Sequence, residues 1–180
     1  MVIKAAECMD WMQKLTAIIA KAQRTACWVT PMGVKIEQKN LHYSSKQVET
    51  YWGGIMIRLR QNVSTRRLAG RKMQNGIAPN FIHSLDASHL LKTVLSLAEH
   101  GITDVSMIHD SYGVHATKVG QMRDCIRESF VKMYSDDLLQ KFYNDVTAEL
   151  PQELIDKLPP MPSKGKLVPE DVLKSKYFFA

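Results

Sequence analysis

Apolar residues recur at helical spacing in four segments of this chain, residues 2–24, 80–100, 119–133 and 139–150. Each segment has one apolar face, so each needs a partner surface to cover it. The stretches 27–62 and 102–117 instead combine short apolar runs with glycine, proline and polar turn residues, which is typical of β-hairpins. The pattern therefore predicts an α+β fold, mostly helical with β-hairpins.

Composition indicates an ordinary globular chain and excludes several classes. The 180 residues are 45% hydrophobic and 23% charged, and no apolar run reaches the ~18 residues that span a bilayer. Glu7, Asp10 and Lys14 interrupt the first helical pattern, which excludes a secretory signal. Cys8, Cys27 and Cys125 are scattered and form no CxxC pair, which favours a reducing compartment and disfavours a structural zinc site.

Positive charge is concentrated in one block. No acidic residue occurs between Thr50 and Leu85, and the formal net charge of the whole chain is +6. Such a block is expected to face nucleic-acid phosphates, although a solvated linker fits the composition equally well. Few aromatic residues lie there, so a stacking platform for single strands is not indicated. The six cations are Arg58, Arg60, Arg66, Arg67, Arg71 and Lys72.

The remaining organisation is predicted as follows. Residues 27–62 form one long hairpin with its tip in the polar stretch 39–49, and Gly53-Gly54 marks a bulge. A basic connector without clear period covers 64–76. Residues 151–180 form a looser extension around short helices at 152–158 and 170–174. The chain divides into an amphipathic helix (1–26), the hairpin (27–62), a central portion (63–150) and this extension.

Asp110 is the most informative acid, because it falls at a tight turn between two apolar patterns. Residues 102–108 read as a strand and 112–117 as its return. A carboxylate there is costly if buried, unless a metal or cation compensates it, and two-magnesium polymerases need such a rigid acid. A simple turn-forming role is the alternative. His109 is expected on the opposite strand face in a supporting role, and Tyr112 on the Asp110 face or simply half-buried.

A second polar group lies on the predicted central helix. His83 and Asp86 are three residues apart, so an imidazole–carboxylate contact is possible. His83 and His89 are six apart, which matches no common zinc spacing. The alternative is that these side chains are buried and satisfied. The group consists of Asn80, His83, Ser84, Asp86 and His89.

The chain ends on Tyr177, Phe178, Phe179 and Ala180, an unusually apolar terminus. These aromatics are expected to dock onto the domain, either for stability alone or to place the carboxylate of Ala180 near a site.

Four blocks together resemble one family. They are Cys27-Trp28-Val29-Thr30-Pro31-Met32-Gly33, the run from Asn75-Gly76-Ile77-Ala78-Pro79-Asn80 through His83 and Asp86 to His89, the segment Ile108–Gly113, and the Phe178-Phe179-Ala180 end. In this order they look like the C-terminal part of the single-subunit RNA polymerases of bacteriophages and mitochondria. Related DNA polymerases carry His-Asp-Glu where this chain has His109-Asp110-Ser111, so the triplet favours RNA synthesis.

The resemblance implies a right-hand polymerase fold, with this chain forming part of palm and fingers. Asp110 would be the second metal-binding aspartate, holding Mg²⁺ for attack of the RNA 3′-hydroxyl, and His83 would lie near the incoming ribonucleoside triphosphate. Residues 34–60 would form a promoter-reading hairpin that enters the major groove of the DNA template at its promoter, with Arg58, Arg60 and the tip around Gln47 and Glu49 as the candidate contacts. Phe179 and Ala180 would pack near the active site.

Members of this family are several times longer than this chain. The first metal aspartate, the fingers helix with its lysine and tyrosine, and an N-terminal domain have no counterpart here. One carboxylate cannot hold two metals, so we expect no RNA product from the chain alone. The start at Met1 favours a subunit of a split polymerase that acts with a complementary polypeptide. We expect neither membrane contact nor secretion. A phage-encoded enzyme would act in the cytoplasm of the infected bacterium. The alternatives are a non-catalytic nucleic-acid-binding fragment or a segment cut from a longer chain.

Overall fold

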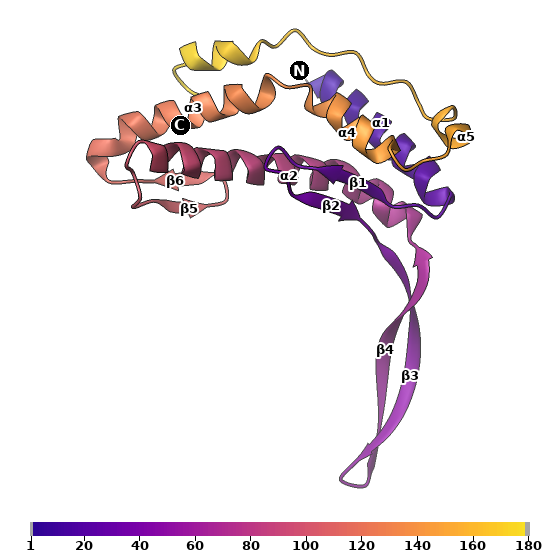
Figure 1. Ribbon diagram of the computed structural model, residues 1–180. Helices are drawn as coiled ribbons and strands as arrows, with labels where there is room; N and C mark the ends of the chain where they lie inside the picture. The colour runs from indigo at the N-terminus through magenta and orange to yellow at the C-terminus, as the bar shows by residue number, and fades with distance from the viewer. Residues whose placement is uncertain (1, 179–180) are drawn as a thin grey trace.

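The structure is a computed structural model that describes residues 2–178, and it combines helices with three separate two-stranded antiparallel sheets, an α+β architecture (Figure 1). No helix in this part of the chain is long and apolar enough to cross a membrane. The elements are α1 (Val2–Lys21), β1 (Ala26–Val29), β2 (Lys35–Gln38), β3 (Leu41–Trp52), β4 (Ile55–Leu68), α2 (Gly70–Glu99), β5 (Ser106–Ile108), β6 (Ser111–Gly113), η1 (Ala116–Lys118), α3 (Val119–Tyr134), α4 (Leu138–Thr147), α5 (Gln152–Ile155) and η2 (Pro169–Lys174).

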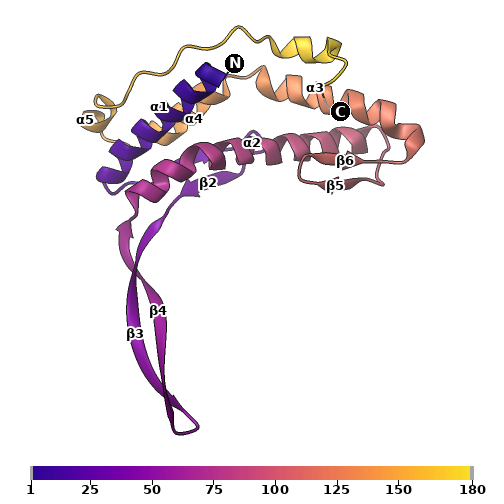
Figure 2. The same ribbon diagram turned by 180° about the vertical axis from the view of Figure 1, so that it is seen from behind.

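Helix α2 is the central element against which α1 and α3 pack. Helices α1 and α4 cover its first half, and α3 lies along its second half (Figures 1 and 2). The larger core joins α1, β1, α2 and α4 through buried Trp28, Phe81 and Phe142, and the ring centroids of Phe81 and Phe142 lie 4.6 Å apart. A smaller core at the other end contains Leu97, Ile102 and Cys125. Two cores therefore share one helix.

Helix α2 begins ten residues earlier than the apolar pattern predicts, at Gly70 instead of Asn80, and it continues through Pro79. Proline removes one backbone donor, here the one that would bond the carbonyl of Asn75 in the preceding helical turn. Met73 and Ile77 precede the proline and are fully buried. Their burial outweighs the local cost of Pro79, so tertiary packing overrides the propensity that would start the helix later.

Residues 27–62 do not form one hairpin, and this prediction is wrong. Strands β1 and β2 make a small hairpin on the larger core, whereas β3 and β4 form a separate long ribbon that projects from the molecule (Figure 1). Gly53 and Gly54 are its turn, not a bulge, with φ of 57° and 79°. Two consecutive positive φ values match the right-handed twist of a hairpin and favour glycine at both positions. The tip therefore lies well beyond residues 39–49.

The basic segment after the ribbon tip is ordered in regular elements. Strand β4 runs to Leu68 and α2 starts at Gly70, so residues 64–76 are not an irregular connector. The irregularity lies within the ladder, where Leu41 pairs with Leu68 but Tyr43 pairs with Ser64. Arg66, in the extra residues, has φ of 62°. A bulge of this kind bends the strand and redirects its side chains.

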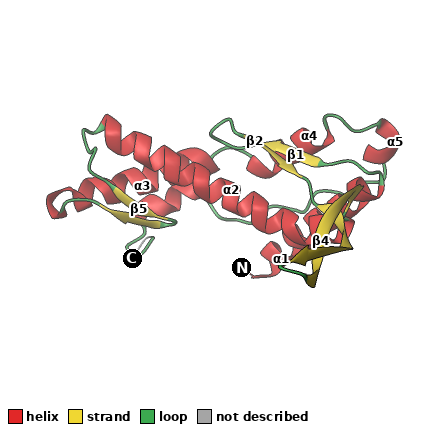
Figure 3. Cartoon of the chain, turned by 90° about the horizontal axis from the view of Figure 1, so that it is seen from below, coloured by secondary structure: helices red, strands yellow, loops and turns green. Residues whose placement is uncertain are grey.

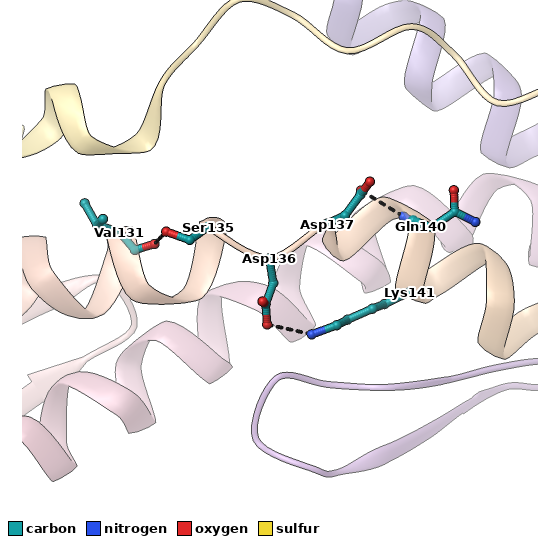
Figure 4. Close-up of polar contacts among 6 residues, drawn as sticks. All are labelled: Val131, Ser135, Asp136, Asp137, Gln140 and Lys141. Carbon is teal, nitrogen blue, oxygen red and sulfur yellow. Dashed lines mark hydrogen bonds and ion pairs between the residues drawn. The ribbon is translucent and has the colours of Figure 1, made fainter.

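Polar contacts fix the junction between α3 and α4 (Figure 4). Asp137 caps α4 by accepting a hydrogen bond from the backbone nitrogen of Gln140 at 3.1 Å, and Lys164 also bonds Asp137. Lys141 Nζ lies 2.6 Å from Asp136 Oδ2. These lysine hydrogen bonds hold the pKa of Asp136 and of Asp137 below the usual value. The junction thereby aims α4 back over α1 and β1.

The C-terminal segment runs back across the molecule from α5 to α3 (Figures 1 and 2). Near α5, Trp11 Nε1 donates to the carbonyl of Pro159 at 3.1 Å, and near α3 the ring of Phe178 lies 4.7 Å from that of Phe130. Tyr177 is exposed. The predicted docking of the terminal aromatics is thus seen at Phe178, while Phe179 and Ala180 lie outside the described residues.

Candidate active site and nucleic-acid interface

Asp110 lies at the exposed end of a short hairpin. Strands β5 and β6 pair Met107 with Tyr112 and Ile108 with Ser111, which leaves His109 and Asp110 as a two-residue turn. The strands are shorter than residues 102–108 and 112–117 predict. Residue 102 belongs to the turn that closes the C-terminal end of α2, because the backbone nitrogen of Ile102 donates to the carbonyl of Leu97 at 2.9 Å. The Ile102 side chain packs in the smaller core, so the strand begins later.

The turn carries backbone strain at His109, whose φ is 56°. Glycine is the usual residue at such a position, and another residue costs on the order of 1–2 kcal/mol. His109 and Asp110 line the same cleft, of about 670 Å³. The predicted placement of His109 on the opposite face is therefore wrong, since strand alternation does not hold within a turn.

Helix α2 supplies the other wall of this cleft through His83, Asp86, Ala87 and Leu90, which recur once per helical turn. His83 and Asp86 are both exposed, and no hydrogen bond joins them within residues 2–178. Two carboxylates and two imidazoles thus line one cleft. The three-residue spacing predicts that His83 and Asp86 share a face, and both line the cleft, but the possible contact between them is not formed in the described part of the chain.

A second cavity, of about 540 Å³, lies on the other side of Asp110. Its lining includes Tyr112 from the hairpin and Met122, Arg123 and Ile126 from α3. Asp110 borders both cavities, so groups bound in either would meet the same carboxylate. Arg123 adds a cation that the sequence reasoning missed, because no apolar or basic pattern singles it out.

Ring contacts among buried His89 and half-buried Tyr112 and Phe130 support the hairpin. The ring centroid of Tyr112 lies 6.4 Å from that of His89, which in turn packs edge-on against Phe130 at 5.7 Å. His89 Nε2 bonds the carbonyl of Ile126 at 2.9 Å, so Nε2 carries the hydrogen. Burial lowers the pKa of His89 and raises the pKa of Tyr112. Both side chains therefore favour their neutral forms and act in packing.

Two other members of the polar group on α2 are structural. Ser84 is buried, donates to Phe81 O at 2.6 Å and accepts from Trp28 Nε1 at 3.1 Å. Asn80 donates to Gln38 Oε1 at 2.5 Å and so ties β2 to α2. Ser84 and His89 therefore follow the alternative of buried and satisfied polar groups, whereas Asn80 is bonded but exposed, and His83 and Asp86 line the cleft.

The described residues offer only part of a metal site. Asp110 and Asp86 present the oxygen ligands that Mg²⁺ prefers. Within residues 2–178, however, no three His, Cys, Asp or Glu side chains are grouped to hold a metal ion. Cys8, Cys27 and Cys125 are free thiols, and burial raises the pKa of Cys8. A metal held at Asp110 would need further ligands from outside this part of the chain.

The six predicted nucleic-acid-binding cations are all exposed, and they divide into two sets. Arg58 and Arg60 lie on the ribbon, directly opposite Glu49 and Gln47, and Arg58 Nε donates to Glu49 Oε1 at 3.0 Å. The others lie at the root of the ribbon, which projects from one end of the molecule while β5 lies at the other (Figure 3). The root set is Arg66, Arg67, Arg71 and Lys72.

The exposed acidic turn and the ribbon with its exposed arginines thus lie at opposite ends of the molecule (Figure 3). The family model of DNA-dependent RNA polymerase matches residues 1–158, and the chain belongs to this family. It is 35% identical to the DNA-directed RNA polymerase of Enterobacteria phage T3 and 34% identical to T7 RNA polymerase of Escherichia phage T7. Each match covers 99% of this chain and 22% of the phage protein.

A plant relative shows the same likeness over a larger share of its length. The DNA-directed RNA polymerase 2A of Nicotiana tabacum is 31% identical over 95% of this chain and 49% of that protein. The chain thus spans about a fifth of the phage relatives and about half of this plant relative.

Proposed function

We propose that this chain forms the C-terminal palm and fingers portion of a phage-type, single-subunit DNA-directed RNA polymerase. It acts in template-directed RNA synthesis from ribonucleoside triphosphates on a DNA promoter, together with the remaining parts of the enzyme. Those parts belong to a complementary polypeptide, as in a split polymerase, or to a longer form of the same chain. In a phage-encoded enzyme this activity belongs to the cytoplasm of the infected bacterium.

The observation that supports this function is the position of Asp110. The hairpin that carries it is packed through Tyr112 against His89 of α2, yet Asp110 itself is exposed and lines a cleft. An acid used only to form a turn needs neither that cleft nor a strained neighbour at His109. A rigidly supported, accessible carboxylate suits metal-assisted phosphoryl transfer.

Asp110 and the side chains around it have distinct roles in this proposal. Asp110 would hold Mg²⁺ together with an aspartate outside this chain. A Mg²⁺ ion held there would supply positive charge to offset that of the α-phosphate during attack by the RNA 3′-hydroxyl. His83 faces the same cleft and would contact the triphosphate of the incoming nucleotide. His109 and Tyr112 position Asp110, His109 through the turn and Tyr112 through its packing. Phe179 and Ala180 would complete the support from the C-terminus.

The ribbon is assigned to promoter recognition. A two-stranded β-ribbon fits the major groove of DNA, where arginine bonds guanine and glutamine bonds adenine. Arg58, Arg60 and Gln47 share one face of the ribbon and are exposed. The root set, Arg66, Arg67, Arg71 and Lys72, would contact phosphates without reading sequence.

Asp110→Asn tests the enzymatic proposal in the polymerase assembled around this chain. RNA elongation on a DNA template should fall by roughly a thousandfold or more, because several kcal/mol of charge stabilisation are removed. DNA binding should remain. Asp104→Asn is the matched control, since Asp104 is an exposed acid before the same hairpin. Normal elongation by the Asp110 variant would exclude Asp110 as a metal ligand.

A second candidate function is nucleic-acid binding without catalysis, which the six exposed cations favour. In that case the chain binds DNA alone, and no mixture with polymerase parts gives Mg²⁺-dependent RNA synthesis. Activity in a mixture, abolished by Asp110→Asn, would exclude this candidate.

A further inference from the structure

The ribbon β3–β4 has two chemically different faces. In an antiparallel pair, residues directly opposite one another share a face, and the face alternates along each strand. Gln47 pairs with Arg60 and Glu49 with Arg58, whereas Val48 pairs with Leu59 between them. By these pairings the polar face carries Ser45, Gln47, Glu49, Arg58, Arg60, Asn62 and Ser64, together with Tyr43, Tyr51 and Met56. The opposite face, called the apolar face below, carries Val48, Trp52, Ile55, Ile57, Leu59 and Val63, together with Ser44, Lys46, Thr50 and Gln61.

Nothing in residues 2–178 covers the apolar face. Trp52 and Ile55, paired beside the turn, are 79% and 70% exposed, and Leu59 is 53% exposed. The whole ribbon stands away from the helices (Figures 1 and 2). A contiguous apolar surface of this kind marks an interaction site, since monomeric proteins seldom leave one in water.

DNA is a poor occupant for this face. Base recognition requires donors and acceptors, and phosphate contacts require cations, whereas apolar side chains meet little more than thymine methyl groups. Along the paired positions from Leu41 to Leu68, the apolar side carries a single charged residue, Lys46. The polar side carries Glu49, Arg58 and Arg60. The two faces therefore fit two different partners.

We infer that the apolar face of the ribbon docks on an apolar surface in the remainder of the polymerase, leaving the polar face free for DNA. The inference rests on the proposed function, and the chain length supports the choice of occupant. The phage relatives are covered over only 22% of their length, so most of such an enzyme lies outside this chain. An isolated two-stranded hairpin is marginally stable in water, so base reading at fixed geometry needs support from behind.

Cysteine accessibility tests this docking without requiring catalysis. Leu59→Cys labels the apolar face and Gln47→Cys labels the polar face one register pair away. The maleimide reaction rate of each is measured by mass spectrometry, in the chain alone and in the assembled polymerase without DNA. Both positions are exposed, so neither variant threatens the fold. Assembly should slow the cysteine at 59 by at least about tenfold and leave the cysteine at 47 reactive until promoter DNA is added.

Each other outcome overturns the inference. Equal reactivity at 59 with and without assembly would show that the face stays open. Protection at 59 only after DNA addition would make DNA the occupant. Protection in the chain alone that grows with its concentration would indicate a second copy. Failure of the polymerase proposal is distinguishable, because it would appear as absent RNA synthesis, whichever thiol is protected.

Discussion

The two hairpins β3–β4 and β5–β6 both turn through two residues, but they differ in what holds them. The ribbon β3–β4 is exposed along almost its whole length and turns through Gly53-Gly54 without strain. The hairpin β5–β6 has three residues per strand, packs through Tyr112 against His89, and accepts a strained histidine at its turn. Packing can hold a conformation that local sequence disfavours, whereas an unsupported ribbon must use residues that already favour it.

Removing the packing behind the short hairpin should give the largest effect. Tyr112→Ala deletes the ring against His89, and we expect a loss of about 3 kcal/mol in the free energy of unfolding, with loss of elongation. Urea unfolding and RNA synthesis measure the two effects. Tyr51→Ala is the control on the ribbon, because Tyr51 is 72% exposed and should leave stability unchanged. Equal destabilisation by both variants would remove the contrast between the hairpins.

Neutralising the root of the ribbon should weaken DNA binding in a salt-dependent manner. The combined variant Arg66→Gln, Arg67→Gln and Arg71→Gln removes three cations that would each meet a phosphate. The slope of log affinity against log salt should therefore flatten by about 2.7. The combined variant should therefore lose more affinity at 50 mM salt than at 200 mM salt. The two fold-losses should differ by a factor on the order of 40. Filter binding across salt concentrations measures the slope. An unchanged slope would show that these three arginines are solvated and contact no phosphate.

Changing the ribbon turn should affect recognition more than stability. Gly54→Val places a β-branched residue at φ of 79°, which costs on the order of 1–2 kcal/mol locally. Because the ribbon is not part of either core, the melting temperature should hold while promoter selectivity falls in competition assays.

The reciprocal variant His109→Gly sharpens the same comparison. It relieves the strain at the short turn but increases the entropy of the unfolded chain, so stability should change by less than about 1 kcal/mol. A large destabilisation would show that the imidazole packs in the folded state.

The smallest effect concerns pH. Burial lowers the pKa of His89 below its ordinary value of 6.5, so the unfolded chain takes up this proton first as the pH falls. Stability should therefore decrease as the pH drops through that value, and level off below the folded-state pKa. His89→Gln should flatten this dependence in urea unfolding followed against pH. His42→Gln, at an exposed ribbon histidine, is the control.

Elements with strong periodicity were predictable, and those set by distant contacts were not. The stripe Met122, Ile126, Phe130 and Met133 predicts α3 almost to its ends. The start of α2 was missed because burial of Met73 and Ile77 overrides Pro79, which no local pattern reveals. The two hairpins in residues 27–62 were merged because Gly53-Gly54 was interpreted as a bulge, although two adjacent glycines also favour a tight turn.

The sequence predicts which residues form the candidate site, but not how they are arranged in space. The turn at Asp110 follows from sequence, yet its meeting with His83 and Asp86 depends on how α2 and β5–β6 pack. His109 was placed on the wrong face because strand alternation was extended into a turn. The two faces of the ribbon require the register between β3 and β4, which depends on locating the turn first.

In the proposed polymerase, helix α2 would set the distance between the promoter-reading ribbon and the cleft beside Asp110. The ribbon joins it at Gly70 and the cleft begins at His83, thirteen residues later (70 to 83), or about 20 Å along the axis at the ~1.5 Å rise of each helical residue. In the proposed polymerase this stiff offset fixes how far the first copied base lies from the bases that are read. One inserted residue would add about 1.5 Å and rotate one end by about 100°. In that proposal, the length of α2 would help to set the start point of the transcript.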